Sequence, residues 1–266
     1  MQFALAVVRA GFRSRAFHGV IALGVALIGV AFLAASFSPR QPQIVALDVG
    51  LSGIRFALIL LALFWVQDFL TKEVERKTVL YSLSYPVSRM AYLFGRLAGI
   101  LCLLGLAALL LGLLLLLAVI SAGKGYDAAY SPALGLPYWA TVFGLWLGVC
   151  VVTTFAFMLA ALSTVSFLPL ALGAAFAIAA QSLGAVADYL ASGADGQEQL
   201  VARYAPIIDT VRWVLPDLSR LDWRTWAMYG IGPSASEVGY SLMMAGAYCV
   251  VLFYLSVLAF AKRDFN

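Results

Sequence analysis

The chain has 266 residues, of which 64% are hydrophobic and only 11% are charged. An ordinary soluble domain is nearer half apolar and about a quarter charged, so a soluble fold of this length could not cover so much apolar surface. The formal net charge of +4 is small and spread along the chain, which argues against nucleic-acid binding. Long continuous apolar runs, rather than short alternating ones, indicate membrane-spanning helices.

The N-terminal residues 1–17 predict a basic amphipathic helix that lies on a membrane surface. Arg9 and Arg13 are one helical turn apart, and Arg15 follows among apolar neighbours. A cleaved signal peptide is the alternative, since a charged start also precedes an apolar stretch in such peptides. The apolar stretch here is longer than a signal core, which favours a retained helix.

Apolar runs of about 18 or more residues are long enough to cross a bilayer as helices. The charge-free stretch 128–187 is far too long for one crossing, and its polar break ending at Pro169 divides it in two. The chain shows no internal repeat or linker, so residues 1–266 are expected to form one membrane domain. The predicted spans cover residues 19–37, 49–68, 95–121, 138–162, 167–188 and 238–261.

The basic residues predict the orientation of these spans. An even number of crossings puts both termini on one side, together with the segment 68–96. That side carries ten of the basic residues, whereas the first two loops of the other side carry only Arg40, Arg55 and Lys124. The long segment 188–237 adds four Arg, but long translocated segments count for little. Both termini are therefore expected in the cytoplasm, and residues 188–237 outside it.

The cysteines and the single histidine predict no metal or catalytic centre. Cys102, Cys150 and Cys249 all lie inside apolar runs without metal-ligand spacing, and His18 stands alone at a membrane edge. An intramembrane protease would need a Ser–His pair or paired aspartates in adjacent spans. The chain is therefore expected to be no enzyme and to hold no cofactor of its own.

The cytoplasmic segment 68–96 carries the most informative pattern. A cluster of charges is followed by Val79, Leu80 and Leu83, which share one face of a short helix, and Pro86 ends it. A short amphipathic helix over about 72–86 suits docking onto a soluble partner. From these residues alone, an ordinary interfacial loop between two spans explains the pattern equally well.

This segment resembles the signature of ABC-2 type permeases, which are the membrane subunits of ATP-binding-cassette transporters. The match consists of acidic residues, a Thr, a Leu-rich turn and Pro-Val-Ser-Arg, with Gly95-Arg96 where Gly-Lys is frequent. Lys77 departs from the family pattern, which usually has Gly before the Thr. The matching residues are Glu73, Glu75, Thr78, Leu83, Pro86, Val87, Ser88 and Arg89.

The resemblance implies an all-α membrane fold with six spans, an N-terminal amphipathic helix, a cytoplasmic coupling helix and short extracellular helices between spans five and six. It implies a half-permease of an exporter in a bacterial inner membrane, in which two chains, expected to be identical, line the pathway with their first, second and fifth spans. A separate cytoplasmic ATPase dimer would bind ATP and Mg, because the chain lacks G-x-x-x-x-G-K-[ST]. The implied coupling residues are Glu73, Glu75, Arg76, Thr78, Leu83, Pro86 and Arg89.

Two features predict interactions at the outer side. Arg55 and Asp188 lie at similar depth near the outer ends of the second and fifth spans, so a salt bridge between them is one hypothesis. Snorkelling of each into the interface is the alternative. Trp213, Trp223 and Trp226 are typical of membrane-interface anchors in short helices, which could cap the exit, bind a periplasmic partner or simply touch lipid.

Two other functions fit a multi-pass membrane protein. A passive scaffold or assembly factor of a larger complex needs no transport, so ATPase-dependent flux would separate it from a permease. An ion-coupled carrier would need sodium or proton dependence, and it usually shows inverted repeats and broken helices, which the sequence lacks. The cargo is not indicated beyond a preference for lipidic or amphipathic molecules.

Overall fold

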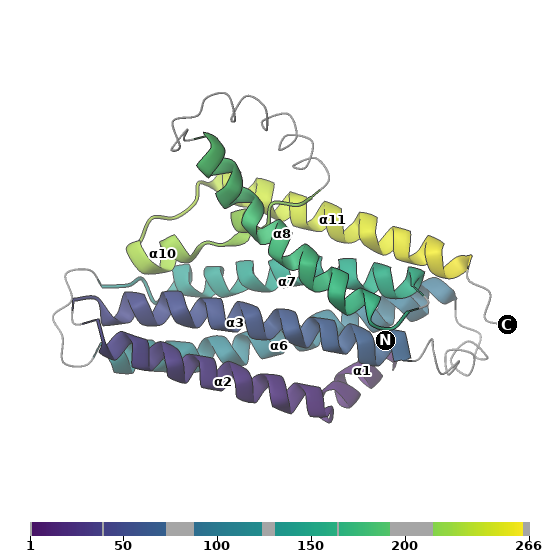
Figure 1. Cartoon of the computed structure of the whole chain (residues 1–266), viewed down its shortest axis with the longest axis horizontal. Coiled ribbons are helices and arrows are strands. Elements are labelled where there is room, and N and C mark those ends of the chain that lie inside the picture. The colour runs from purple at the N-terminus through teal and green to yellow at the C-terminus, as the bar shows by residue number, and fades with distance from the viewer. Residues whose placement is uncertain are drawn as a thin grey trace.

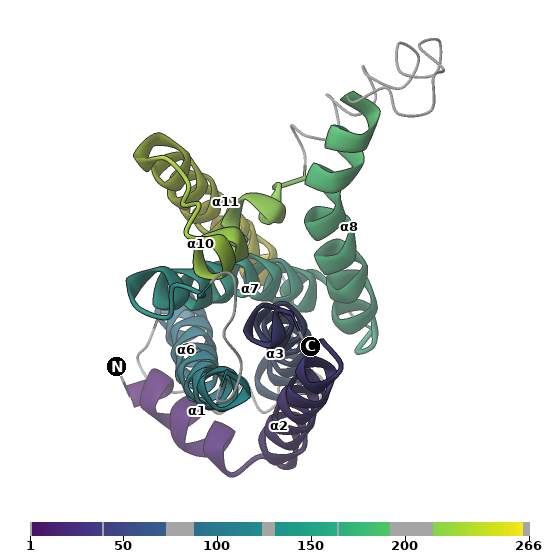
Figure 2. The same cartoon turned by 90° about the vertical axis from the view of Figure 1, so that its left-hand side faces the viewer.

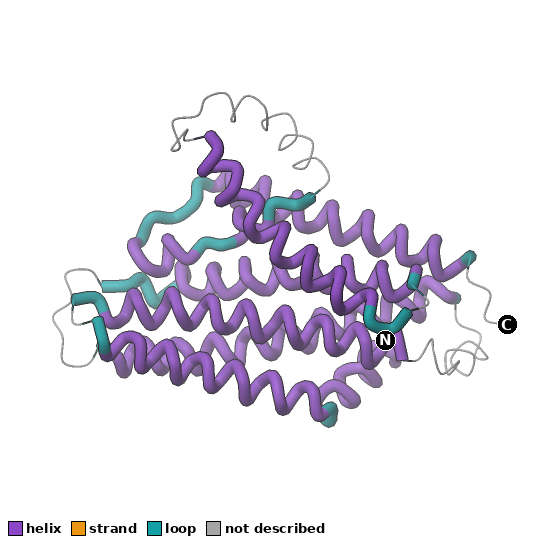
Figure 3. The backbone as a smooth tube through the Cα atoms, in the orientation of Figure 1, coloured by secondary structure: helices purple, strands orange, loops and turns teal. Residues whose placement is uncertain are grey.

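The computed structural model describes residues 2–38, 40–72, 88–123, 131–163, 165–191 and 215–262. Over these ranges all regular structure is helical (Figure 3). Six of the described helices are long and apolar enough to cross a membrane. The predicted all-α membrane fold is therefore confirmed.

The spanning helices are longer than the charge-free windows of the sequence. The second begins at Pro42, because proline suits the first turn of a helix. The last begins at Ala235, after a capping box between Ser234 and Glu237. In chain order the elements are α1 (Gln2–Phe12), α2 (Arg15–Ser36), α3 (Pro42–Val66) continued by the π-helix η1 (Gln67–Thr71), α6 (Arg89–Ala122), α7 (Leu136–Leu162), α8 (Leu168–Ala191), the 3₁₀-helix η2 (Leu218–Leu221), α10 (Arg224–Tyr229) and α11 (Ala235–Ala261).

The N-terminal helix is shorter than the sequence predicts. It ends at Phe12, and Ser14 caps a new helix by accepting a hydrogen bond from the backbone N–H of Phe17 at 3.1 Å. Arg15 therefore belongs to the first turn of α2. The indole N–H of Trp65 in α3 also donates to the Ser14 hydroxyl at 3.4 Å, so the break between α1 and α2 is held against the bundle.

Helices α2, α3, α6 and α7 form the centre of the molecule, and α1 packs on α6 (Figures 1 and 2). In the most apolar stretches of α3 and α7, 61% of the residues are buried, compared with 17% in α11. Figure 2 shows α8 and α11 leaving α7 on opposite sides, with the chain of η2 between them. The two outlying helices therefore leave apolar surface for lipid or for another protein.

The bundle has two distinct ends. The start of α1 and the end of α11 lie at one end, called here the terminal end, and α10 lies at the opposite end, called the α10 end (Figure 1). At the terminal end Arg89 begins α6, and its guanidinium donates to the carbonyl oxygens of Phe260 at 3.4 Å and Ala261 at 3.0 Å. These are last-turn carbonyls that a helix cannot satisfy itself. Arg89 therefore joins α6 to the end of α11.

Two glycines let the short helix η2 lie close to its neighbours. A Cβ at Gly144 of α7 would overlap the backbone carbonyl of Leu221, and one at Gly184 of α8 would overlap the Ser219 hydroxyl. Side chains at either place would push η2 away. The close approach of η2 to α7 and α8 therefore depends on glycine at both positions.

The variant Gly144→Ala should lower the free energy of unfolding by about 2 kcal/mol, because the backbone of η2 must move to make room. The matched control is Gly148→Ala, one turn further along α7, where the nearest atom would be Leu221 Cδ1 at 4.0 Å. The control should be neutral or slightly stabilising, since Ala is the better helix former. Thermal unfolding in mild detergent measures both, and equal effects of the two substitutions would contradict the packing argument.

Candidate functional site

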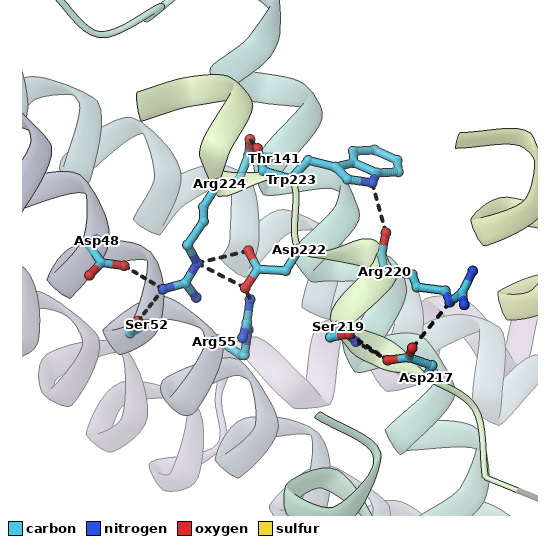
Figure 4. A network of polar contacts seen from close by, with 10 residues as sticks. All are labelled: Asp48, Ser52, Arg55, Thr141, Asp217, Ser219, Arg220, Asp222, Trp223 and Arg224. Carbon is cyan, nitrogen blue, oxygen red and sulfur yellow. Dashed lines mark hydrogen bonds and ion pairs between the residues drawn. The ribbon is translucent and has the colours of Figure 1, made fainter. Parts of the chain in front are cut away.

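A network of four charged side chains joins α3 to the segment between η2 and α10 (Figure 4). On α3, Asp48, Ser52 and Arg55 stand at i, i+4 and i+7, which places them on one face of the helix. Facing them are Asp222 and Arg224, two residues apart on either side of Trp223. The packing of these two elements against each other brings residues that are far apart in the chain into one cluster.

The contacts run crosswise between the two elements. Arg55 Nη2 pairs with Asp222 Oδ2 at 2.5 Å, and Arg224 Nη1 donates to Asp48 Oδ1 at 2.5 Å and to the Ser52 hydroxyl at 3.1 Å. Within the second element, Arg224 Nε donates to both carboxylate oxygens of Asp222, at 3.0 and 2.9 Å. The four charges thus alternate in sign along one chain of contacts and sum to zero.

Burial sets the importance of each charge. The side chains of Arg55 and Asp222 are each 15% exposed and that of Arg224 is 21% exposed, whereas Asp48 is 54% exposed. A largely buried charge is costly unless it is paired, and removing one partner costs more than the pair contributes. Asp48 keeps much of its hydration. The pair between Arg55 and Asp222 is therefore the centre of the network.

The pKa values of the second element follow from the same arrangement. Burial on its own would raise the pKa of Asp222, but the charge of Arg55 and the hydrogen bonds and charge of Arg224 outweigh it and hold the pKa below its ordinary value. Burial would lower the pKa of Arg224, but Asp222 and Asp48 outweigh it and raise that pKa. Asp222 and Arg224 are therefore both ionised at neutral pH.

Backbone contacts fix the segment that carries Asp222 and Arg224. The Thr141 hydroxyl of α7 contacts the backbone carbonyl of Trp223 at 2.9 Å, and the Trp223 indole donates to the carbonyl of Arg220 at 3.0 Å. Trp223 is only 6% exposed, so its ring packs within the protein. The structure thus gives Trp223 a packing role in place of the membrane anchor expected from the sequence. Trp226 is half-buried in α10, and Trp213 lies outside the described residues.

A second polar cluster holds η2 in shape. Asp217 caps this helix by accepting from the backbone N–H of Ser219 at 3.2 Å, and it pairs with Arg220 at 3.2 Å. The Arg220 guanidinium also lies over the ring of Tyr240 in α11, 5.2 Å from its centre. Helices η2 and α10 therefore pack on α3, α7, α8 and α11.

Arg55, which the sequence predicts to pair with Asp188, forms an ion pair with a different aspartate. Its partner in the structure is Asp222, while the side chain of Asp188 lies outside the description, so the Asp188 pairing stays a prediction. Sequence reasoning missed Asp48, Ser52, Asp222 and Arg224. A second span that begins at about residue 49 places Asp48 in a loop, although the i, i+4, i+7 spacing to Arg55 is visible in the sequence.

Few of the predicted coupling residues can be placed. Arg89 lies at the terminal end, where it contacts the last carbonyls of α11. Arg9, Arg13 and Arg15 are exposed near the same end, in α1, in the break after it and in α2. The other predicted coupling residues, Glu73, Glu75, Arg76, Thr78, Leu83 and Pro86, lie outside the described residues.

The fold and the network define a multi-pass α-helical membrane protein in which η2 and α10 are held by charges on a spanning helix. Comparison with protein families identifies the family within this class. The family model described as ABC-2 family transporter protein matches residues 8–265. The chain belongs to the ABC-2 transporter family, whose members are membrane components of transporters. A search of curated proteins finds no match to the chain.

The variant Asp222→Asn should lower the free energy of unfolding at about pH 7 by about 3 kcal/mol, because Arg55 keeps its charge and loses its counter-ion. The folded-state pKa of Asp222 lies below its ordinary value of 3.8. The stabilisation is therefore fully present above pH 3.8 and is lost as the pH falls through the folded-state pKa. Thermal unfolding of both proteins between about pH 7 and about pH 3 measures this difference.

The control for this experiment is Asp68→Asn. Asp68 pairs with Lys72 at the terminal end, and that pair is 29% and 48% exposed. Exposed pairs contribute about 0.5 kcal/mol, so the control should unfold almost as the parent protein does. Two results would contradict the assignment of a buried ion pair. One is equal stability of Asp222→Asn and the parent protein at neutral pH, and the other is a stability difference that persists unchanged in acid.

Proposed function

We propose that this protein is the permease subunit of an ATP-binding-cassette exporter in a bacterial inner membrane. The observation that carries the proposal is the family match over residues 8–265, in a chain with six helices able to cross a membrane. Both termini and the terminal end face the cytoplasm, and the α10 end faces outwards. The distribution of basic residues supports this orientation.

A separate cytoplasmic subunit supplies the energy. The sequence contains no phosphate-binding loop, so ATP and Mg bind to a partner ATPase. That partner docks on residues 72–86 and on the N-terminal helix. Arg89 follows the docking segment directly and holds the end of α11, so a displacement of the segment moves α6 and α11 together.

A second permease chain completes the pathway. Helices α2 and α8 both carry large apolar side chains that are exposed, such as Leu33 on α2 and Ile178 on α8. Both helices lie on the same side of the bundle in Figure 2. A second copy that packs there would enclose a pathway between the first, second and fifth spans of the two chains.

The ion network acts in this mechanism as a latch at the outer end. It closes the bundle by holding η2 and α10 against α3. Because α3 contributes Asp48 and Arg55 and the other element contributes Asp222 and Arg224, each half carries one acid and one base. Neither half carries a net charge after the two separate, but the largely buried Arg55 then needs another anion in place of Asp222.

Purification of the tagged chain from native membranes in mild detergent tests the proposal. A co-purifying ATPase with a phosphate-binding loop, at one copy for each permease chain, is the expected result, and reconstituted vesicles should then show ATP-dependent flux. Retention of some other membrane complex without an ATPase would overturn the permease proposal and indicate a scaffold. Flux that needs a sodium or proton gradient and no ATP would indicate a carrier.

The variant Glu75→Lys should uncouple ATP hydrolysis from transport, because it reverses a charge in the proposed docking segment. We expect normal membrane insertion, ATPase activity of the complex that no longer responds to cargo, and a loss of flux of about tenfold or more, which corresponds to about 1.4 kcal/mol of lost coupling. The control is Asp264→Lys, the same change in the C-terminal tail. Unchanged transport in Glu75→Lys would rule out the assignment of residues 72–86 as the coupling helix.

A further inference from the structure

We propose that Arg55 and Gln181 bind the anionic headgroup of an amphiphilic cargo, and that this headgroup competes with Asp222 for the Arg55 guanidinium. The inference rests on the proposed permease function and names the class of molecule that the permease moves. It begins from a small cavity of about 20 Å³ beneath η2, where α3, α7 and α8 meet.

Arg55 and Gln181 are the polar side chains that line this cavity, and they come from α3 and α8. Gly144 and Gly148 of α7 form part of the wall. The remaining lining is apolar and consists of Ile59, Leu145, Val149, Val152, Ala177, Leu218 and Leu221. The cavity thus combines one cation and one amide with an apolar surround, which suits a molecule with a charged head and an apolar tail.

The guanidinium of Arg55 has unused capacity for an anion. Its contact with a described residue is a single one, from Nη2 to Asp222 Oδ2. A guanidinium presents several N–H donors in a planar fork that fits two oxygens of a phosphate or carboxylate at once. Replacement of Asp222 by such a headgroup would increase the number of hydrogen bonds that Arg55 makes.

Burial decides which charge the ligand must carry. Arg55 is 15% exposed, so it cannot lose Asp222 without gaining another anion. Asp48 is 54% exposed, so it can lose Arg224 and remain hydrated. A ligand on this face of α3 must therefore supply a negative charge and need not supply a positive one.

Asp222 can change partners at low cost. Arg224 already contacts both of its carboxylate oxygens from two residues away in the same segment. When η2 and α10 move outwards, Asp222 therefore leaves with its own counter-ion. Arg55 stays on α3, where it becomes available to the incoming headgroup.

The cavity is too small for the headgroup while η2 and α10 are closed over α3, so the closed state and the cargo-bound state exclude each other. A space of about 20 Å³ holds a single water molecule. A headgroup fits only after Leu218 and Leu221 of η2 withdraw. Cargo and the closed latch therefore occupy the same place, so that arrival of the headgroup favours opening.

Lipid binding to the purified, delipidated full chain tests the inference, with native mass spectrometry as the readout. The probes are a phosphatidylglycerol, a phosphatidylcholine with the same acyl chains, and glycerol 3-phosphate. We expect a preference for phosphatidylglycerol that Arg55→Gln lowers by about tenfold, the loss of one charge-assisted contact. Arg55→Lys should retain part of it, because the charge remains and the fork is lost.

Two further variants complete the design. Asp222→Asn should bind phosphatidylglycerol about threefold or more tightly, because the competing anion is removed. Arg40→Gln removes a positive charge from the same end of the bundle without touching the cavity, and it should bind as the parent protein does. If Arg55→Gln fails to fold, as judged by thermal unfolding, Asp222→Asn decides, and its failure to tighten binding overturns the inference.

The outcomes separate this inference from the proposed function. Equal losses in Arg55→Gln and Arg40→Gln would show general attraction to the outer surface and would overturn the site. Binding of glycerol 3-phosphate as tight as that of phosphatidylglycerol would overturn the amphiphilic cargo and assign a soluble anion. If an ATPase co-purifies but phosphatidylglycerol binding does not depend on Arg55, the site is rejected and the permease proposal stands. If binding depends on Arg55 but no ATPase co-purifies, the site stands and the permease proposal is rejected.

Discussion

A carboxylate held between two guanidinium groups organises the α10 end of this molecule. Asp222 accepts from Arg55 of α3 and from Arg224 of its own segment, in a place that is largely shielded from water. Removing the charge of Asp222 would leave Arg55 without a counter-ion in a region of low polarity. The position of η2 and α10 over the bundle depends on this arrangement, and so does the small cavity beneath them.

Packing and charge act together in this region. The glycines of α7 and α8 bring the backbone of η2 close enough for Asp222 to reach Arg55. The Thr141 hydroxyl then positions the carbonyl of Trp223, between the two charged residues. Loss of close packing would therefore weaken the ion pair, and loss of the ion pair would loosen the packing.

The two ends of the bundle are connected through continuous helices. Arg89 joins the start of α6 to the end of α11 at the terminal end. Near the start of α11, the Ser241 hydroxyl donates a hydrogen bond to the carbonyl of Arg220 in η2 at 3.2 Å. Helix α11 is also the least buried of the spanning helices and packs mainly on α7. It therefore offers a physical route between the proposed coupling segment and the proposed latch.

The sequence by itself determined the class of the protein, the number of spanning helices and the family, because these depend on the length of apolar runs and on a local motif. The close partners of Arg55 were decided only by tertiary structure. The sequence does not place Asp48 in the second span, because a charge near the end of an apolar run does not reveal whether the helix continues past it. Asp222 and Arg224 lie more than 160 residues further along the chain, in a polar segment whose folding against α3 depends on close packing at two glycines. Periodicity reports which face of a helix is apolar, but the pairing of distant charges depends on how the helices are arranged in space.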